Sequence, residues 1–186
     1  MRLRLLAAAL VATLAAGLAA CSSGPTNAAP TAAATSAAPD AAFPATVATK
    51  FGDVTINAKP TKVVALGWGD AETALALGVQ PVGASDWLGF GGEGVGPWAK
   101  GLYTTPPVII GTMEPSFEKI AALKPDLILD VKGSGDQARY DRLKSIAPTI
   151  GVPKGGDSYL TNQQQQLSMI AAALGEKAKG EALAKE

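Results

Sequence analysis

Residues 63–85, VVALGWGDAETALALGVQPVGAS, decide the fold class, because they combine a strand, a short loop, a helix and a second strand. The first four residues form a continuous apolar run, which is typical of a strand covered on both faces. Residues 70–77 then place apolar side chains at helical spacing, with Gly69 or Asp70 available as the N-terminal cap. Gly78 stands where a left-handed C-terminal cap is expected, and a second short strand closes the stretch.

The same alternation of strand and helix continues through the rest of the chain. A buried strand over residues 126–131, DLILDV, follows a helix over 116–123 that Ser116 can cap and Pro125 ends. The further expected elements are a hairpin at 45–49 and 54–57, a strand at 108–110, a helix at 137–146 and a strand at 149–152. This pattern predicts an α/β fold, with a parallel sheet, flanking helices and right-handed crossovers.

Aromatic and charged residues follow several of the predicted strands. Ligands of parallel sheets bind beyond the carboxyl ends of the strands. Four features are therefore expected on one ligand-binding rim: Trp68, Trp87, the 111–114 loop and Lys132. Trp68 lies between two glycines, and we expect its indole to face a ligand. The alternative is that this indole packs beneath its own loop.

The segment LGFGGEGVGPW, residues 88–98, contains five glycines. Such a segment is typical of a mobile lid, with Phe90 and Trp98 as its apolar contacts. The alternative is a solvent loop with Trp98 folded onto the core. The glycines do not match a dinucleotide-binding fingerprint, because no helix follows them directly. The tyrosines read as packing or surface residues: Tyr103, Tyr140 and Tyr159.

The composition argues against several classes of function. Basic and acidic residues each number 16, so no excess of charge favours nucleic acid or an anionic lipid surface. The chain has no histidine and one cysteine, which removes histidine-dependent triads and His/Cys clusters for zinc, copper or iron–sulfur centres. Since no nucleophile–base pair or metal constellation stands out, we expect neither an enzyme nor a cofactor.

The first 20 residues read as a targeting segment. Arg2 and Arg4 precede an apolar run over 5–18, which is shorter than the roughly 20 residues needed to span a bilayer. The run ends in Leu-Ala-Ala-Cys and looks like a bacterial lipobox, with Cys21 as the lipidated residue. An ordinary signal peptide with an incidental cysteine is the alternative. We expect a signal peptide over 1–20 and an exported protein, lipid-anchored to the outer face of the cell membrane.

Composition also suggests the domain boundaries. Residues 21–42 are almost all Ala, Pro, Thr and Ser, and they predict a flexible stalk. Residues 43–160 form the predicted N-terminal α/β lobe, and residues 161–186 a helical segment with a break at Gly175. Because this last segment stops in mid-helix without a cap, glycine or proline, we expect the sequence to be truncated.

Three segments carry a resemblance to a known family: KPTKVVALGWGDAETALALGVQPVGAS, IGTMEPSFEKIAALKPDLILD and QLSMIAAALGEKAKGEAL. From residue 45 onward the chain resembles the substrate-binding lipoproteins of ABC importers for ferric siderophores, which are related to cobalamin and haem binders. The resemblance implies two α/β lobes joined by one long helix, with the ligand held between them. It therefore implies that this chain contains the leader, the stalk, the N-terminal lobe and the beginning of that helix.

The resemblance also implies roles for individual residues. Relatives often place an aromatic residue that stacks on the ligand where Trp87 stands. They dock an acidic residue of each lobe to arginines of the permease, and Glu118 occupies that helix start. The alternative for Glu118 is contact with the helix dipole, which also explains Glu72. On the rim, Glu114 either accepts hydrogen bonds from a ligand amide or caps its turn, and Lys132 either neutralises an anionic iron complex or is solvated.

The expected function is that of a monomeric, non-enzymatic receptor that captures a ferric siderophore and delivers it to ABC permease subunits. Iron would arrive already chelated, so the protein needs no metal ligands of its own, and aromatic rings suit a large, partly apolar complex. Two alternatives stay open. One is cobalamin or haem as the cargo of the same fold, and the other is a lipid-anchored domain that binds another protein through the aromatic rim.

Overall fold

The computed structural model describes residues 42–186, and every element below belongs to this part of the chain. The signal peptide predicted over 1–20, the lipidated Cys21 and nearly all of the predicted stalk lie outside the described residues. No helix within 42–186 has the length and apolar character needed to cross a membrane. The predicted division at residue 160 stays a prediction.

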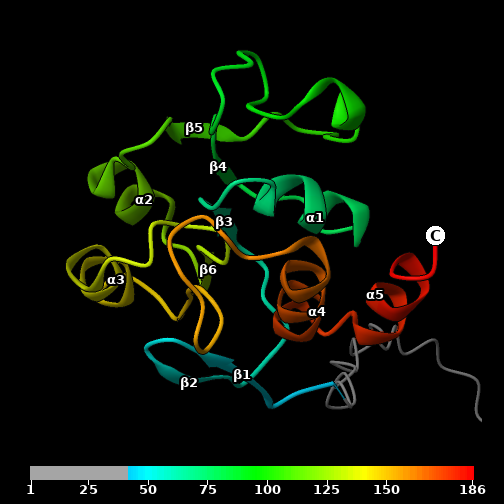
Figure 1. Cartoon of the computed structure of the whole chain (residues 1–186). Coiled ribbons are helices and arrows are strands. Elements are labelled where there is room, and N and C mark those ends of the chain that lie inside the picture. Colours follow the sequence, from blue (N-terminus) through cyan, green and yellow to red (C-terminus); the bar gives the residue numbers. More distant parts are fainter. Residues whose placement is uncertain (1–41) are drawn as a thin grey trace, which may run out of the picture. The chain divides into compact units, whose positions relative to one another are not determined.

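A five-stranded parallel sheet lies at the centre of the described residues (Figure 1). Its strands stand in the order β5-β4-β3-β6-β7. They are β3 (Val63–Ala65), β4 (Gly83–Ser85), β5 (Val108–Gly111), β6 (Leu127–Leu129) and β7 (Thr149–Ile150). Each strand overlaps the run predicted for it, and the predicted α/β fold class is confirmed.

The strand order reverses at the centre of the sheet. The chain runs outward from β3 to β4 and β5, and then returns to the other side of β3 to form β6 and β7. In open parallel sheets, ligand sites lie beyond the carboxyl ends of the strands at such a switch point. The loops that follow β3 and β6 contain Trp68 and Lys132, and the backbone N–H of Trp68 donates to the carbonyl oxygen of Lys132 at 3.1 Å.

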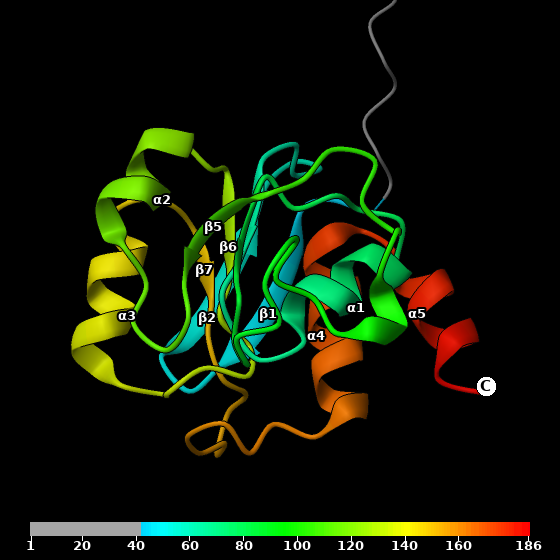
Figure 2. The same ribbon diagram turned by 90° about the horizontal axis from the view of Figure 1, so that it is seen from above.

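Helices cover both faces of the sheet and give three layers (Figure 2). They are α1 (Asp70–Ala76), α2 (Phe117–Leu123), α3 (Gln137–Lys144), α4 (Gln163–Leu174) and α5 (Lys177–Leu183). One face carries α2 and α3, and the opposite face carries α1 and α4, with α5 packed against α4. The sheet is therefore enclosed on both sides, as the continuous apolar runs of its strands predict.

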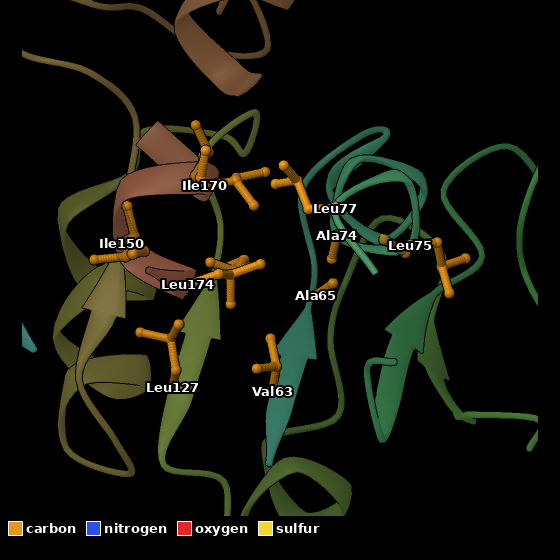
Figure 3. Close-up of a cluster of buried hydrophobic side chains, with 14 of the residues drawn as sticks. Val63, Ala65, Ala74, Leu75, Leu77, Leu127, Ile150, Ile170 and Leu174 are labelled. Atoms are coloured by element: carbon orange, nitrogen blue, oxygen red, sulfur yellow. The ribbon is translucent and has the colours of Figure 1, made fainter. Parts of the chain in front are cut away.

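The central strands β3 and β6 alternate their side chains between two buried clusters. Val63 and Ala65 of β3 belong to the cluster on the α1 and α4 side, together with Ile150 and Leu174 (Figure 3). Val64 belongs to the cluster on the α2 and α3 side. All five side chains are at most 1% exposed, and burial of each large aliphatic side chain contributes about 1.5–3 kcal/mol. Buried side chains on both faces thus hold the strands whose carboxyl ends carry the loops of the site.

The antiparallel hairpin of β1 (Ala45–Thr49) and β2 (Gly52–Ile56) confirms the prediction for this region. It packs against α4, and its turn joins the segment after β7, where the Lys50 N–H donates to the Val152 carbonyl oxygen at 2.9 Å. The ring of Phe51 stacks on Tyr140 at a centroid distance of 4.0 Å. Tyr140 is therefore a packing residue, as expected.

Helix ends agree with the sequence, and the structure decides between the two caps expected at α1. Ser116 is the N-cap of α2 and accepts a hydrogen bond from the Lys119 N–H at 3.3 Å. Gly175 ends α4 at φ 74°, and a Cβ there would meet the ring of Phe43 at 2.7 Å. Gly69, rather than Asp70, is the N-cap of α1 and makes no side-chain bond. The Asp70 carboxylate is instead buried beneath the loop that carries Trp68.

Candidate functional site

Trp68 and Trp87 lie side by side at the carboxyl end of the sheet. Trp68 is in the loop between β3 and α1, and Trp87 follows β4. Their ring centroids are 5.7 Å apart and their planes differ by 26°, which is an offset stack. Both side chains are half-buried. The prediction that the two indoles share one rim is confirmed, since Trp68 stacks on a ring of another loop.

Three more rings extend this pair into a continuous series. Tyr159 also stacks on Trp68, at a centroid distance of 4.5 Å. Phe90 meets Trp87 edge-on at 5.4 Å, and Trp98 meets Phe90 edge-on at 5.7 Å. We call Tyr159, Trp68, Trp87, Phe90 and Trp98 the aromatic row. The sequence predicts only packing or solvent exposure for Tyr159, and no pattern near it indicates a place beside Trp68.

The glycine-rich segment contributes the far end of the aromatic row. Asp86 holds this segment, because its carboxylate accepts hydrogen bonds from the Phe90 and Gly91 N–H groups at 2.7 and 2.8 Å. A hollow of about 560 Å³ lies against the segment, with Phe90 among its lining residues. Trp98 is 67% exposed, so the alternative in which it folds onto the core is wrong.

A buried carboxylate supports the loop of Trp68. Asp70 is fully buried, and its carboxylate accepts hydrogen bonds from the Gly67 N–H at 3.2 Å, the Val131 N–H at 2.8 Å and the Gln166 amide at 2.6 Å. The same amide donates to the Trp68 carbonyl oxygen at 2.8 Å. Burial raises the pKa of Asp70 to about 7; the Gln166 hydrogen bond opposes this shift.

A second buried carboxylate holds Trp87. Glu72 is 8% exposed, and its Oε1 accepts hydrogen bonds from the indole Nε1 of Trp87 at 3.1 Å and from the Gly96 N–H at 3.3 Å. Contact with the helix dipole was the expected role of Glu72, but its hydrogen bonds are made to Trp87 and Gly96. These partners lie 15 and 24 positions away in the sequence, so no local pattern indicates them.

An ion pair lies beside the Tyr159 end of the aromatic row. Arg139 binds Asp130 through Nε at 3.0 Å and Nη2 at 2.7 Å, and both side chains are largely buried. Nη1 also donates to the Met113 carbonyl oxygen at 3.2 Å, which fixes the loop after β5. Burial opposes the charged form of Arg139, but the hydrogen bonds and charge of Asp130 raise its pKa above the usual value. No motif in the sequence marks either residue.

Comparison with known proteins identifies the family. The model of a periplasmic binding protein family matches residues 63–186, which is the sheet from β3 onward together with its helices. The chain belongs to the periplasmic binding protein family. Proteins of this family bind substrates and are not enzymes.

Three relatives of this periplasmic binding protein illustrate the similarity. The probable siderophore-binding lipoprotein YfiY of Bacillus subtilis (strain 168) is 36% identical over 129 residues, covering 67% of this chain and 36% of YfiY. The Fe(3+) dicitrate-binding periplasmic protein FecB of Escherichia coli (strain K12) is 32% identical over 137 residues, covering 73% and 44%. The crystal structure of Streptococcus pneumoniae TIGR4 PiaA in complex with ferrichrome superposes with a TM-score of 0.67 and 29% identity, covering 75% and 48%. The chain spans less than half of each.

The charged residues predicted for the ligand site of this periplasmic binding protein take different places. Lys132 is half-buried in the loop after β6, where its carbonyl oxygen fixes Trp68. Glu114 is exposed in the loop that Arg139 holds, and its charge contributes to the raised pKa of Arg139. The backbone of Lys132 thus contacts the aromatic row at Trp68. Glu114 instead lies near the ion pair of Arg139 and Asp130. Ligand contact by either side chain stays a prediction.

Glu118 lies in the first turn of α2 and is exposed. Its Oε2 accepts a hydrogen bond from the Ser116 hydroxyl at 3.2 Å. Its own backbone N–H and then this hydroxyl lower the pKa of Glu118, which keeps the carboxylate charged. The side chain is available to a partner, and permease contact stays a prediction.

The described residues contain no group of three or more Asp, Glu, His or Cys side chains arranged to hold a metal ion. The rim therefore offers a ligand mainly aromatic rings for stacking. Backbone groups of three loops and a few charged side chains supply its polar contacts. Five rings in series offer a broad apolar face with polar edges, and such faces suit ligands that are themselves large and partly apolar.

Proposed function

We propose that this chain provides one wall of a receptor that captures a ferric siderophore outside the membrane and delivers it to an ABC permease. The observation that carries this proposal is the aromatic row at the switch point of the sheet. Its rings come from the loops after β3, β4 and β7, so segments distant in sequence converge on one surface. Half-buried rings on a rigid sheet edge are suited to ligand stacking.

The names of the relatives support iron complexes as the ligand class. YfiY is named for siderophores, FecB for Fe(3+) dicitrate, and PiaA was crystallised with ferrichrome. In all three the iron is held by an organic chelator, so the receptor can bind the chelator rather than the metal. The aromatic row fits this mode, because it contacts ligand faces and supplies no metal ligand. We propose that no cofactor is needed.

Location and partners belong to the same proposal. The signal peptide over 1–20 would export the chain, and acyl chains on Cys21 would hold it on the outer face of the membrane, as the lipoprotein name of YfiY supports. Glu118 is exposed at the start of α2, on the loop side of the sheet, and would meet a basic residue of the permease. The receptor would act as a monomer.

A titration tests the ligand class. The mature chain is titrated by calorimetry with a ferric hydroxamate, a ferric catecholate, ferric citrate, haem and cobalamin. Tightest binding of one of the three ferric chelates is expected. Tightest binding of haem or cobalamin would overturn the ligand assignment, and no binding by the full-length protein would favour the aromatic row as a protein-binding surface.

A pair of substitutions then tests the site. Trp68→Ala removes the ring that stacks on both Tyr159 and Trp87 and is expected to weaken binding of that chelate at least tenfold, or about 1.4 kcal/mol. Phe51→Leu is the matched control, because Phe51 stacks on Tyr140 in the hairpin instead of in the row. Equal affinities for the two variants would contradict the placement of the ligand on the aromatic row.

A further inference from the structure

Glu72 occupies an unusual position for an ionisable residue. It lies in the first turn of α1, yet its side chain is 8% exposed and turns toward the glycine-rich segment. One carboxylate oxygen, Oε1, accepts from both the Trp87 indole and the Gly96 backbone. A carboxylate buried at this depth is costly unless its bonds are needed, because desolvation disfavours the charge.

The bonds of Glu72 join Trp87 to the far end of the glycine-rich segment, beyond the part that Asp86 holds. Trp87 follows β4 and stacks on Trp68, while Gly96 directly precedes the helical turn Pro97–Ala99 that presents Trp98. A single oxygen therefore fixes the polar edge of the central indole and the backbone of the far end of the aromatic row. Hydrogen bonds to a charged acceptor are stronger than neutral ones and are directional.

The second oxygen of Glu72 adds an independent observation. Oε2 is buried, and so is the hydroxyl of Tyr103; neither has a hydrogen-bond partner within residues 42–186. Burial raises the pKa of the Tyr103 phenol, and the charges of Glu72 and Glu93 add to the shift, so Tyr103 and Glu72 lie within electrostatic range. An acceptor and a donor thus remain available beneath the glycine-rich segment.

We propose that Glu72 is the positioning residue of the aromatic row: its carboxylate sets the orientation of the Trp87 indole and couples it to the glycine-rich segment. A ligand that stacks on Trp87 then meets a ring whose rotation is already fixed, which lowers the entropic cost of binding. Any shift of that ring is passed to Gly96 through the shared oxygen. The role in ligand affinity rests on the proposed function, whereas the role in indole orientation does not.

The orientation is measured without ligand. Each of the three tryptophans gives one indole N–H signal in an NMR spectrum of the 15N-labelled chain. Glu72→Ala removes the acceptor, and the Trp87 indole proton is expected to exchange with solvent at least about tenfold faster. Glu72→Gln keeps an oxygen for Trp87 and Gly96 and offers an N–H to Tyr103, so it is expected to retain slow exchange. Glu181→Ala, at an exposed glutamate of α5, is the matched control.

Ligand affinity then tests the coupling. With the ferric chelate that binds most tightly in the titration, Glu72→Ala is expected to weaken binding about tenfold and Glu72→Gln less than threefold. Trp87→Phe keeps a ring but removes the donor, so adding Glu72→Ala to it is expected to cause little further loss.

Unchanged exchange of the Trp87 indole proton in Glu72→Ala would overturn the positioning role, whatever the ligand. The positioning role also fails if Glu72→Gln exchanges as fast as Glu72→Ala, or if the losses from Trp87→Phe and Glu72→Ala are additive. Should Glu72→Ala not fold, the affinities of Glu72→Gln and Trp87→Phe for the ferric chelate are compared instead. The positioning role predicts tighter binding by Glu72→Gln, which keeps the hydrogen bond to the Trp87 indole. The wild type could show slow exchange of the Trp87 indole proton and yet bind no chelate. That outcome would contradict the proposed function and leave the orientation role intact.

Discussion

The side-chain amide of Gln166 donates a hydrogen bond to Asp70 at 2.6 Å across 96 positions of the sequence. Its other N–H hydrogen reaches the carbonyl oxygen of Trp68 at 2.8 Å. The amide therefore connects α4 with the loop that presents Trp68 in the aromatic row. One side chain thus links the first turn of α4 to Asp70 and to the backbone of Trp68.

Replacement of Gln166 by leucine is expected to destabilise the fold. It leaves an oxygen of Asp70 and the Trp68 carbonyl without their partner, and loss of partners for buried polar atoms costs about 1–3 kcal/mol each. Urea denaturation measures the change in the free energy of unfolding. Gln165→Ala is the control, because the Gln165 side chain is exposed on the same helix. Similar losses for both variants would show that the amide bonds are not the cause.

The stability is expected to depend on pH through Asp70. Burial raises the pKa of Asp70 to about 7 in the folded chain, against 3.8 for an unperturbed carboxyl. Between these values the folded state binds a proton that the unfolded state has lost. The free energy of unfolding therefore falls as pH rises from about 4 to about 7, by at most about 1.4 kcal/mol per pH unit from this group. The contribution is largest below the unfolded pKa and is lost above the folded one.

Asp70→Asn isolates that contribution, since asparagine keeps the shape and an acceptor oxygen but cannot ionise. Urea denaturation at pH 5 and pH 8 is expected to show a smaller difference for this variant than for the wild type. Asp53→Asn, at an exposed position of the hairpin, controls for the general effect of charge. A difference as large in Asp70→Asn as in the wild type would assign the pH dependence to other groups.

The buried ion pair is expected to matter more for stability than the surface cation next to it. Arg139→Leu leaves the Asp130 carboxylate buried and alone, which costs about 3–5 kcal/mol. Arg142, on the same helix, stacks over Phe117 at 3.5 Å and is exposed, so Arg142→Ala is expected to cost about 0.5–1 kcal/mol. Thermal unfolding of both variants measures the contrast, and a double replacement of Arg139 and Asp130 by leucine is expected to recover part of the loss.

Glu118 is expected to affect transport without affecting the fold. Its side chain is exposed, and its only bonded side-chain neighbour within the described residues is Ser116. Cells that express the full-length protein with Glu118→Ala are expected to take up the iron complex about tenfold more slowly, as loss of one docking contact of about 1.4 kcal/mol would produce. Glu181→Ala serves as the control, and wild-type uptake by Glu118→Ala would rule out this contact.

Local sequence predicts the elements of this chain well but the partners within its site poorly. The apolar run before Gly67, the cap at Ser116 and the break at Gly175 depend on neighbours in sequence, and each lies where expected. Topology also places Trp68 and Trp87 together, because the carboxyl ends of parallel strands share one edge. The residues that complete the site act across long separations.

Tyr159, Arg139 and Glu72 illustrate that limit. Tyr159 has a backbone φ of 56° and reaches Trp68 only after the chain has crossed the whole sheet. Arg139 is, in sequence, one of several charges on a predicted helix, and its burial depends on the loop at Met113. Glu72 is, in sequence, a first-turn acid, and only the return of the glycine-rich segment covers it. The type of a residue does not predict its burial when loops distant in sequence cover it.

The ring of Phe43 lies against Gly175, the residue that ends α4. α4 begins beside Trp68 and ends at Gly175, whose neighbour Leu174 packs in the same cluster as Val63 and Leu127, the first residues of their strands. Gly175 lies nine positions after Gln166, a rise of about 14 Å along the helix axis. Phe43, near the first described residue, therefore lies at the end of α4 that is remote from Gln166 and Trp68.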